Sequence, residues 1–165
     1  MMLYHKNELK THLSDLGIKN NDNIFIHGNA GVASQYCYDD NDPINTFFKE
    51  LKCYLSEGTI IVPTFTYSAT KGEVFDIDTT KSDIGLFSES FRLMDDVKRS
   101  QHPIFSISAI GENSDYFINN RLDDCFGEET FFDKMFVNNV KILTLGCELE
   151  RVTFAHYVEQ KLKVS

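Results

Sequence analysis

The segment T-I-I-V-P at residues 59–63 decides the fold class. It is almost continuously apolar and rich in β-branched residues, which is typical of a strand covered on both faces. Three more segments are predicted strands: N-I-F-I-H at 23–27, I-F-S-I-S-A-I at 104–110 and V-K-I-L-T-L-G at 140–146. The 104–110 segment alternates enough to be a half-buried strand.

Helical patterns fill the chain between these strands. Apolar residues recur at helical spacing in 5–16, 43–55, 88–94, 131–136 and 152–162. Asp42-Pro43 opens the second helix, and Thr130 with Asp133 three residues later predicts a capping box for the fourth. Alternating strands and helices predict an α/β fold, a three-layer α/β/α arrangement with a largely parallel central sheet, in a single domain over residues 1–165.

Composition narrows the class of protein. The 165 residues are 42% hydrophobic and 13% aromatic, enough for one buried core, and the net charge of -9 argues against a nucleic-acid surface and favours cationic small molecules. With no secretory signal and no run of roughly 20 apolar residues, we expect a cytoplasmic protein without a membrane segment. The four cysteines lack C-x-x-C spacing, so we expect buried free thiols and no metal.

Polar and small residues follow the predicted strands, where ligands collect in α/β folds. His27, Thr64 and the segment after Gly146 should therefore converge on one site. The run H-G-N-A-G at 27–31 could offer main-chain N–H groups to a ligand, although it is not the dinucleotide fingerprint G-x-G-x-x-G. The hydroxyl run after Pro63 supplies uncharged donors, and ordinary turn chemistry explains it equally well.

The sequence T-F-A-H-Y-V-E at 153–159 carries the sharpest local signal. On a helix, Thr153, His156 and Glu159 share one face, and a carboxylate beside an imidazole favours a general base. A surface His/Glu pair is the plainer interpretation of the same three residues. A di-iron site is disfavoured because only one copy of the pair is present, in reversed order.

Two further groups of residues are candidates for a functional role. Residues 97–103, V-K-R-S-Q-H-P, place Arg99, Ser100 and His102 in a basic cluster that could bind a phosphate or form a solvated loop. Cys147 follows a strand directly, but the small residues of a nucleophile elbow are missing, which favours a packing thiol.

In order and spacing, five stretches resemble the aminoglycoside 3-N-acetyltransferase family. They are GTIIVPTFTYS (58–68), FDIDTTKSDIGLFSESFR (75–92), RSQHPIFSISAIG (99–111), FGEETFFDKM (126–135) and VKILTLGCELERVTFAHYVE (140–159). The resemblance implies acetyl-CoA-dependent transfer to an amine on an α/β/α fold. The family pattern T-x-x-H-x-x-E falls on 153–159, R-S-x-H-P on 99–103, and P-T on 63–64.

The resemblance also implies roles for individual residues. His156 would be the base, Glu159 its partner, and donors near Thr64 would hold the oxyanion. Asp76 and Thr153 would contact a small-molecule amine, and Arg99 would hold the CoA phosphates or shape their loop. The implied acetyl-CoA wall consists of His27, Gly28, Asn29, Gly31, Thr64, Arg99, Ser100 and His102.

The chain departs from the family at three points. His27-Gly28-Asn29 replaces a common His-Ser-Ser and Lys81 a common Pro, which shifts the expected acceptor from an aminoglycoside toward an amino sugar. Family members also continue past the His/Glu helix, so we expect a C-terminally truncated domain that forms a homodimer. The alternatives are an inactive relative acting as a folded interaction module and, more distantly, a thiol hydrolase that uses Cys147.

Overall fold

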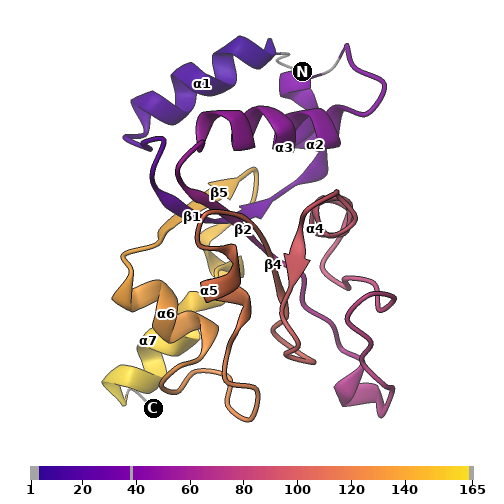
Figure 1. Cartoon of the computed structure of the whole chain (residues 1–165), viewed down its shortest axis with the longest axis vertical. Helices are drawn as coiled ribbons and strands as arrows, with labels where there is room; N and C mark the ends of the chain where they lie inside the picture. Colours follow the sequence, from indigo (N-terminus) through magenta and orange to yellow (C-terminus); the bar gives the residue numbers. More distant parts are fainter. Residues whose placement is uncertain (1–3, 38, 164–165) are drawn as a thin grey trace.

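The computed structural model describes residues 4–37 and 39–163. At its centre lies a five-stranded sheet of order β3-β4-β2-β1-β5 (Figure 1). β1 pairs in parallel with β2 and β5, whereas β4 runs antiparallel to both β2 and β3. The predicted, largely parallel sheet is confirmed, with β4 as the reversed strand. The strands are β1 Asn23–Gly28, β2 Thr59–Pro63, β3 Lys98–Arg99, β4 Ile107–Gly111 and β5 Lys141–Leu145.

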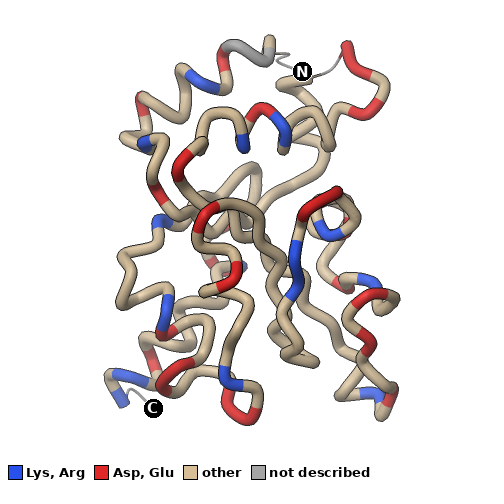
Figure 2. Tube along the Cα trace, in the orientation of Figure 1, with Lys and Arg blue, Asp and Glu red and all other residues tan. Residues whose placement is uncertain are grey.

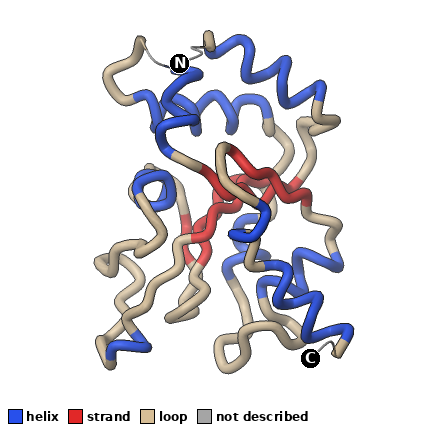
Figure 3. The backbone as a smooth tube through the Cα atoms, turned by 180° about the vertical axis from the view of Figure 1, so that it is seen from behind, coloured by secondary structure: helices blue, strands red, loops and turns tan. Residues whose placement is uncertain are grey.

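Helices cover both faces of the sheet, which confirms the three-layer arrangement (Figures 1 and 3). The first four, α1 to α4, pack on one face, and α5 to α7 on the other. The α-helices are α1 Lys6–Asp15, α2 Ala30–Ala33, α3 Pro43–Tyr54, α4 Leu86–Arg92, α5 Ser114–Ile118, α6 Phe131–Val137 and α7 Phe154–Leu162, with 3-10 turns η1 Ser34–Cys37, η2 Ala69–Lys71 and η3 Leu149–Arg151.

Each face of the sheet has its own apolar core. Ile24 and Ile26 of β1 pack against the α1–α4 layer, while Phe25 between them packs against the α5–α7 layer. β2 divides in the same way, and all five of its residues are buried. Because side chains alternate along a strand, two-sided burial requires the continuous apolar runs seen in both strands.

Helix starts follow the predicted capping chemistry in part. The Asp42 carboxylate accepts from the N–H of Asn45, and Pro43 stands at the first turn of α3. The Thr130 hydroxyl accepts from the N–H of Asp133, as predicted for α6. In a capping box the Asp133 carboxylate would accept from the N–H of Thr130. It accepts instead from the N–H of Glu129, so the predicted capping box is wrong in that half.

Three other details differ from prediction. The strand predicted over 104–110 begins at Ile107, since residues 104–106 pair irregularly with the chain after β2. Helix α2 was not predicted, because its four residues are too few to show periodicity. Cys53 is exposed rather than buried.

Charged residues of both signs are mixed along the chain. Lys and Arg are interspersed with Asp and Glu along the trace (Figure 2). Within residues 4–37 and 39–163, no helix is long and apolar enough to cross a bilayer.

Candidate active site

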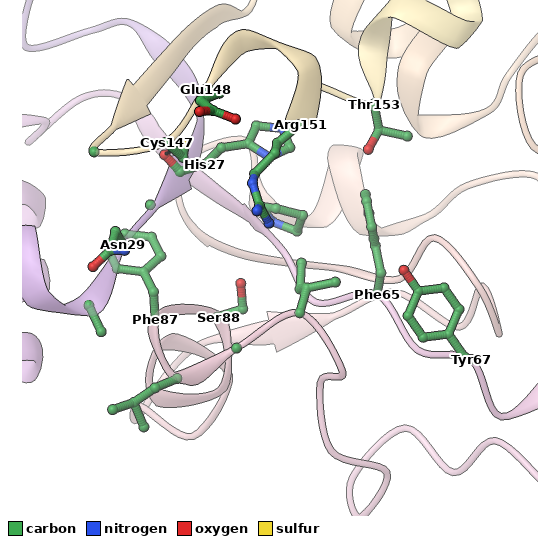
Figure 4. A pocket seen from close by; sticks show the side chains of 17 residues that line it. His27, Asn29, Phe65, Tyr67, Phe87, Ser88, Cys147, Glu148, Arg151 and Thr153 are labelled. Atoms are coloured by element: carbon green, nitrogen blue, oxygen red, sulfur yellow. Dashed lines mark hydrogen bonds between the residues drawn. The ribbon is translucent and has the colours of Figure 1, made fainter.

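A cavity of about 700 Å³ opens at the carboxyl ends of β1, β2 and β5 (Figure 4). It is lined by the end of β1, the chain after β2, the first turn of α4 and the segment after β5. The predicted convergence of His27 with the segment after Gly146 is confirmed. The lining residues are 27–30, 63, 65, 67, 84–88, 146–148, 151 and 153.

His27 stands in the cavity wall as a neutral imidazole. Its ring lies edge-on to Phe25, 4.7 Å between centroids, and only 7% of the residue is exposed. Nε2 has no hydrogen-bond partner in the part of the chain that the structure describes. Burial lowers the pKa of His27 to about 4, because the charged form loses its hydration. An unpaired, buried ring nitrogen beside a cavity is suited to a ligand contact.

His27 should make folding stability depend on pH. The pKa of His27 in the folded chain, about 4, lies below the ordinary histidine value of 6.5, so between these pH values the unfolded chain binds more protons. The contribution is therefore fully present above pH 6.5 and is lost as the pH falls toward 4, by about 3 kcal/mol. Urea unfolding across this range should give a flatter profile for His27→Gln. An unchanged slope in His27→Gln would refute the assignment.

The 27–31 loop lies close to helix α4. A Cβ on Gly28 would come within 2.4 Å of the Phe87 ring, so only glycine allows this approach. The thiol of Cys147 donates to the His27 carbonyl at 3.2 Å, joining the ends of β1 and β5. Gly31 does not line the cavity, and its N–H donates to the Asn29 side chain at 2.8 Å. Of the four loop residues predicted to contact the cofactor, His27, Gly28 and Asn29 line the cavity and Gly31 does not.

Thr64 lies beneath the cavity wall rather than in it. The residue is fully buried, and its hydroxyl donates to the Ser106 carbonyl at 3.2 Å, with Ser108 Oγ equally near. Its N–H also donates to Ser106. The neighbours Pro63 and Phe65 line the cavity instead. The irregular pairing with 104–106 uses these donors, and the role of Thr64 as an oxyanion donor stays a prediction.

In the predicted phosphate-binding cluster, Arg99 binds main-chain carbonyls of the protein itself. The Arg99 guanidinium donates to the carbonyls of Thr80 at 2.5 Å, Thr64 at 2.9 Å and Ile77 at 3.2 Å. It holds the 77–80 loop against the end of β2 and does not reach the cavity. Of the two predicted roles of Arg99, this placement favours shaping the loop. Burial lowers the pKa of Arg99 to about 10, which leaves it charged at neutral pH.

Ser100 and His102 are likewise occupied by main-chain groups. Ser100 Oγ accepts from the N–H of Ile107 at 3.0 Å. His102 Nδ1 accepts from the N–H of Phe105 at 2.9 Å, and burial lowers the pKa of His102. Neither residue lines the cavity, and their direct contact with a cofactor stays a prediction.

Asp76 caps its own turn. Its carboxylate accepts from the N–H and hydroxyl of Thr79 and from the N–H of Asp78. These bonds lower the pKa of Asp76, and the exposed side chain does not line the cavity. Asp76 therefore stabilises its own turn, and its contact with the substrate stays a prediction.

Helix α7 presents His156 and Glu159 as a pair. His156 Nδ1 lies 3.0 Å from Glu159 Oε2, and the two side chains are 63% and 60% exposed. Thr153, which starts the helix, lines the cavity, and its carbonyl accepts from the N–H of His156. The pair is thus formed as predicted, about one helical turn beyond the cavity wall.

A polar network fixes α7 against α6. The hydroxyl of Tyr157 donates to Asp133 at 2.7 Å and accepts from Lys161 at 2.7 Å. The Tyr157 ring, only 2% exposed, stacks on Phe154. The face of α7 opposite His156 is therefore anchored.

Several cavity residues were not predicted. Arg151 and Glu148 belong to the stretch at 140–159 that resembles the family, but no spacing or residue pattern singled out either side chain. Their position becomes visible only when η3 is folded over the strand ends (Figure 4). The remaining side chains that sequence reasoning missed are Tyr67, Ile84, Leu86, Phe87 and Ser88. Across residues 4–37 and 39–163, no group of three or more His, Cys, Asp or Glu side chains is placed to hold a metal ion.

Comparison with known proteins places the chain in a class. Residues 26–165 match the model of the aminoglycoside 3-N-acetyltransferase family, and the chain belongs to that family. A curated relative is the SPbeta prophage-derived aminoglycoside N(3')-acetyltransferase-like protein YokD of Bacillus subtilis (strain 168). It is 30% identical over 84 residues, which are 50% of this chain and 31% of that protein.

Solved structures share the fold. Aminoglycoside acetyltransferase AAC(3)-IVa, an apoenzyme, aligns with a TM-score of 0.85 and 25% identity over 98% of this chain and 62% of its own. AAC-IIIb in a binary complex with CoASH aligns with a TM-score of 0.82 and 22% identity, over 96% of this chain and 65% of its own. The chain thus spans less than two thirds of the length of these two enzymes.

Proposed function

We propose that this chain carries the acetyl-CoA site and the base of an N-acetyltransferase that acts on an amine of an amino sugar or aminoglycoside. One observation carries the proposal: the strand-end cavity extends to Thr153, the residue that starts the helix bearing His156 and Glu159. Family membership supports it, as do solved structures of the same fold, one of them with CoASH and another with sisomicin.

In this mechanism Glu159 orients the base. A carboxylate can only accept, so His156 Nδ1 carries its proton toward Glu159 and leaves the lone pair of Nε2 free. Nε2 takes a proton from the acceptor amine as the amine nitrogen attacks the thioester carbonyl carbon. The carbon–sulfur bond then breaks and the acetyl group passes to nitrogen. CoA leaves as a thiolate that takes the proton from Nε2, which gives the thiol and restores the neutral base.

A second candidate is a folded interaction module without catalysis. It is favoured by the exposure of His156 and Glu159, since solvated His/Glu pairs of this kind also occur as purely structural features. The homodimer predicted from the sequence belongs with either candidate, and sedimentation velocity would detect it.

Ligand-dependent stability separates the two candidates. Acetyl-CoA at 100 times its dissociation constant should stabilise the folded chain by about 2.7 kcal/mol, because only the folded state binds. Thermal unfolding with increasing acetyl-CoA should therefore show a concentration-dependent rise in Tm. Pantothenate at equal concentration serves as the control and should have little effect. An unchanged Tm at millimolar acetyl-CoA would favour the interaction module.

A further inference from the structure

Arg151 brings a positive charge to the cavity. Among the described residues that line it, Arg151 is the one lysine or arginine. The side chain extends from η3 into the middle of the cavity (Figure 4). The chain as a whole carries a net charge of -9, so an anionic ligand needs a local cation to offset the field.

The guanidinium of Arg151 is available to a ligand. Within residues 4–37 and 39–163 it makes no ion pair, although Glu148 lies only three positions away; the other arginines are engaged. Arg92 pairs with Glu89 at 2.8 Å, Arg121 pairs with Asp123 at 2.6 Å, and Arg99 holds three carbonyls. The charge of Arg151 reaches the cavity lining, because it acts to lower the pKa of Cys147 against the larger, raising effect of burial.

His27 adds a second, neutral group to the same wall. Its Nε2 is buried and unpaired among the described residues, and its ring is uncharged at neutral pH. A neutral imidazole does not repel the guanidinium and can donate one hydrogen bond. An arginine fork together with a neutral donor is suited to phosphate oxygens.

We propose that Arg151 binds the diphosphate of coenzyme A, a role that rests on the proposed function. Five residue-to-residue steps separate Arg151 from His156, so their Cα atoms lie at most about 17 Å apart, and closer because three of these steps enter α7. An extended pantetheine arm covers a comparable length between thioester and diphosphate. The 3′-phosphate lies farther along the cofactor, beyond the ribose. The diphosphate is therefore the anionic group at the matching distance.

Calorimetric titration of CoA, dephospho-CoA and pantetheine into Arg151→Gln tests this assignment. Loss of a bidentate arginine contact should weaken binding of CoA and of dephospho-CoA by a similar factor, about 10- to 100-fold. Pantetheine, which has no phosphate, should bind equally to parent and variant. Arg151→Lys should recover part of the loss, because it restores the charge without the fork. Arg121→Gln removes the same charge from an exposed site outside the cavity and should bind CoA as the parent does.

Each other outcome contradicts the assignment in a distinct way. Unchanged CoA affinity in Arg151→Gln would overturn it while leaving the proposed function intact. If Arg151→Gln bound CoA more weakly than the parent but bound dephospho-CoA equally well, Arg151 would contact the 3′-phosphate and not the diphosphate. If pantetheine lost as much affinity as CoA, the substitution would have distorted the cavity. If the parent chain bound none of the three ligands, the proposed function would fail and this inference with it.

Discussion

His156→Ala is expected to slow acetyl transfer by about 10²- to 10⁴-fold, the usual contribution of a positioned base. The His156 side chain is 63% exposed, and among the described residues its one polar contact is with Glu159. Its removal should therefore leave Tm and CoA affinity close to those of the parent chain. Steady-state kinetics at saturating acetyl-CoA, with thermal unfolding of the same samples, separates loss of chemistry from loss of fold.

The pH dependence of turnover and the variant Glu159→Gln give two further checks of His156 as the base. The defect in His156→Ala should shrink as the pH rises toward the pKa of the acceptor amine, which then deprotonates without help. Glu159→Gln should cost less than His156→Ala, because it disturbs orientation without removing the base. Gln160→Ala, an exposed change on the same helix, is the matched control and should have no effect. Parent-like turnover of His156→Ala at neutral pH would exclude His156 as the base.

Arg99→Ala is expected to lower the free energy of unfolding by about 3 to 5 kcal/mol, because it leaves three main-chain carbonyls without their charged donor. The residue is 8% exposed and joins the 77–80 loop to the end of β2. Urea unfolding followed by circular dichroism measures the loss. CoA affinity of the folded fraction should stay within a few-fold of the parent value, since Arg99 does not line the cavity.

Two neighbouring substitutions control for charge and geometry. Lys98→Ala removes a charge at the adjacent, exposed position, where the lysine pairs with Asp115, and should cost less than about 1 kcal/mol. Arg99→Lys keeps the charge but cannot reach all three carbonyls, so it should be intermediate. Stability unchanged in Arg99→Ala, with CoA binding lost, would restore the phosphate-binding role predicted from the sequence.

The three layers could be predicted from sequence because their signals are local. β1 and β2 are buried on both faces of the sheet, so their sequences are almost continuously apolar. Helix α3 has both an N-terminal cap and a regularly spaced apolar face. The same strand ends predicted a site near His27 and Gly146. Short elements such as α2 and η3 gave no such signal, because four or three residues cannot show a period.

The direction in which a side chain points could not be predicted. Arg99 and Thr64 have suitable chemistry next to a strand end, but pairing between the chain after β2 and residues 104–106 turns them inward. Arg151 lies in an unremarkable stretch and is brought to the cavity by the turn after β5. The sequence thus indicated Arg99 for the cofactor phosphates, whereas we propose Arg151, which lines the cavity, for that role.

The central claim is amine-dependent acetyl transfer at the strand-end cavity, and the release of free CoA from acetyl-CoA tests it most directly. The assay follows the new thiol with and without a panel of amines that includes aminoglycosides and amino sugars, and mass spectrometry identifies the acetylated product. We expect CoA release that requires an amine acceptor, yields an N-acetyl product and falls sharply in His156→Ala. If folded protein that binds acetyl-CoA released no CoA with any amine, or released it equally without one, the account would be contradicted.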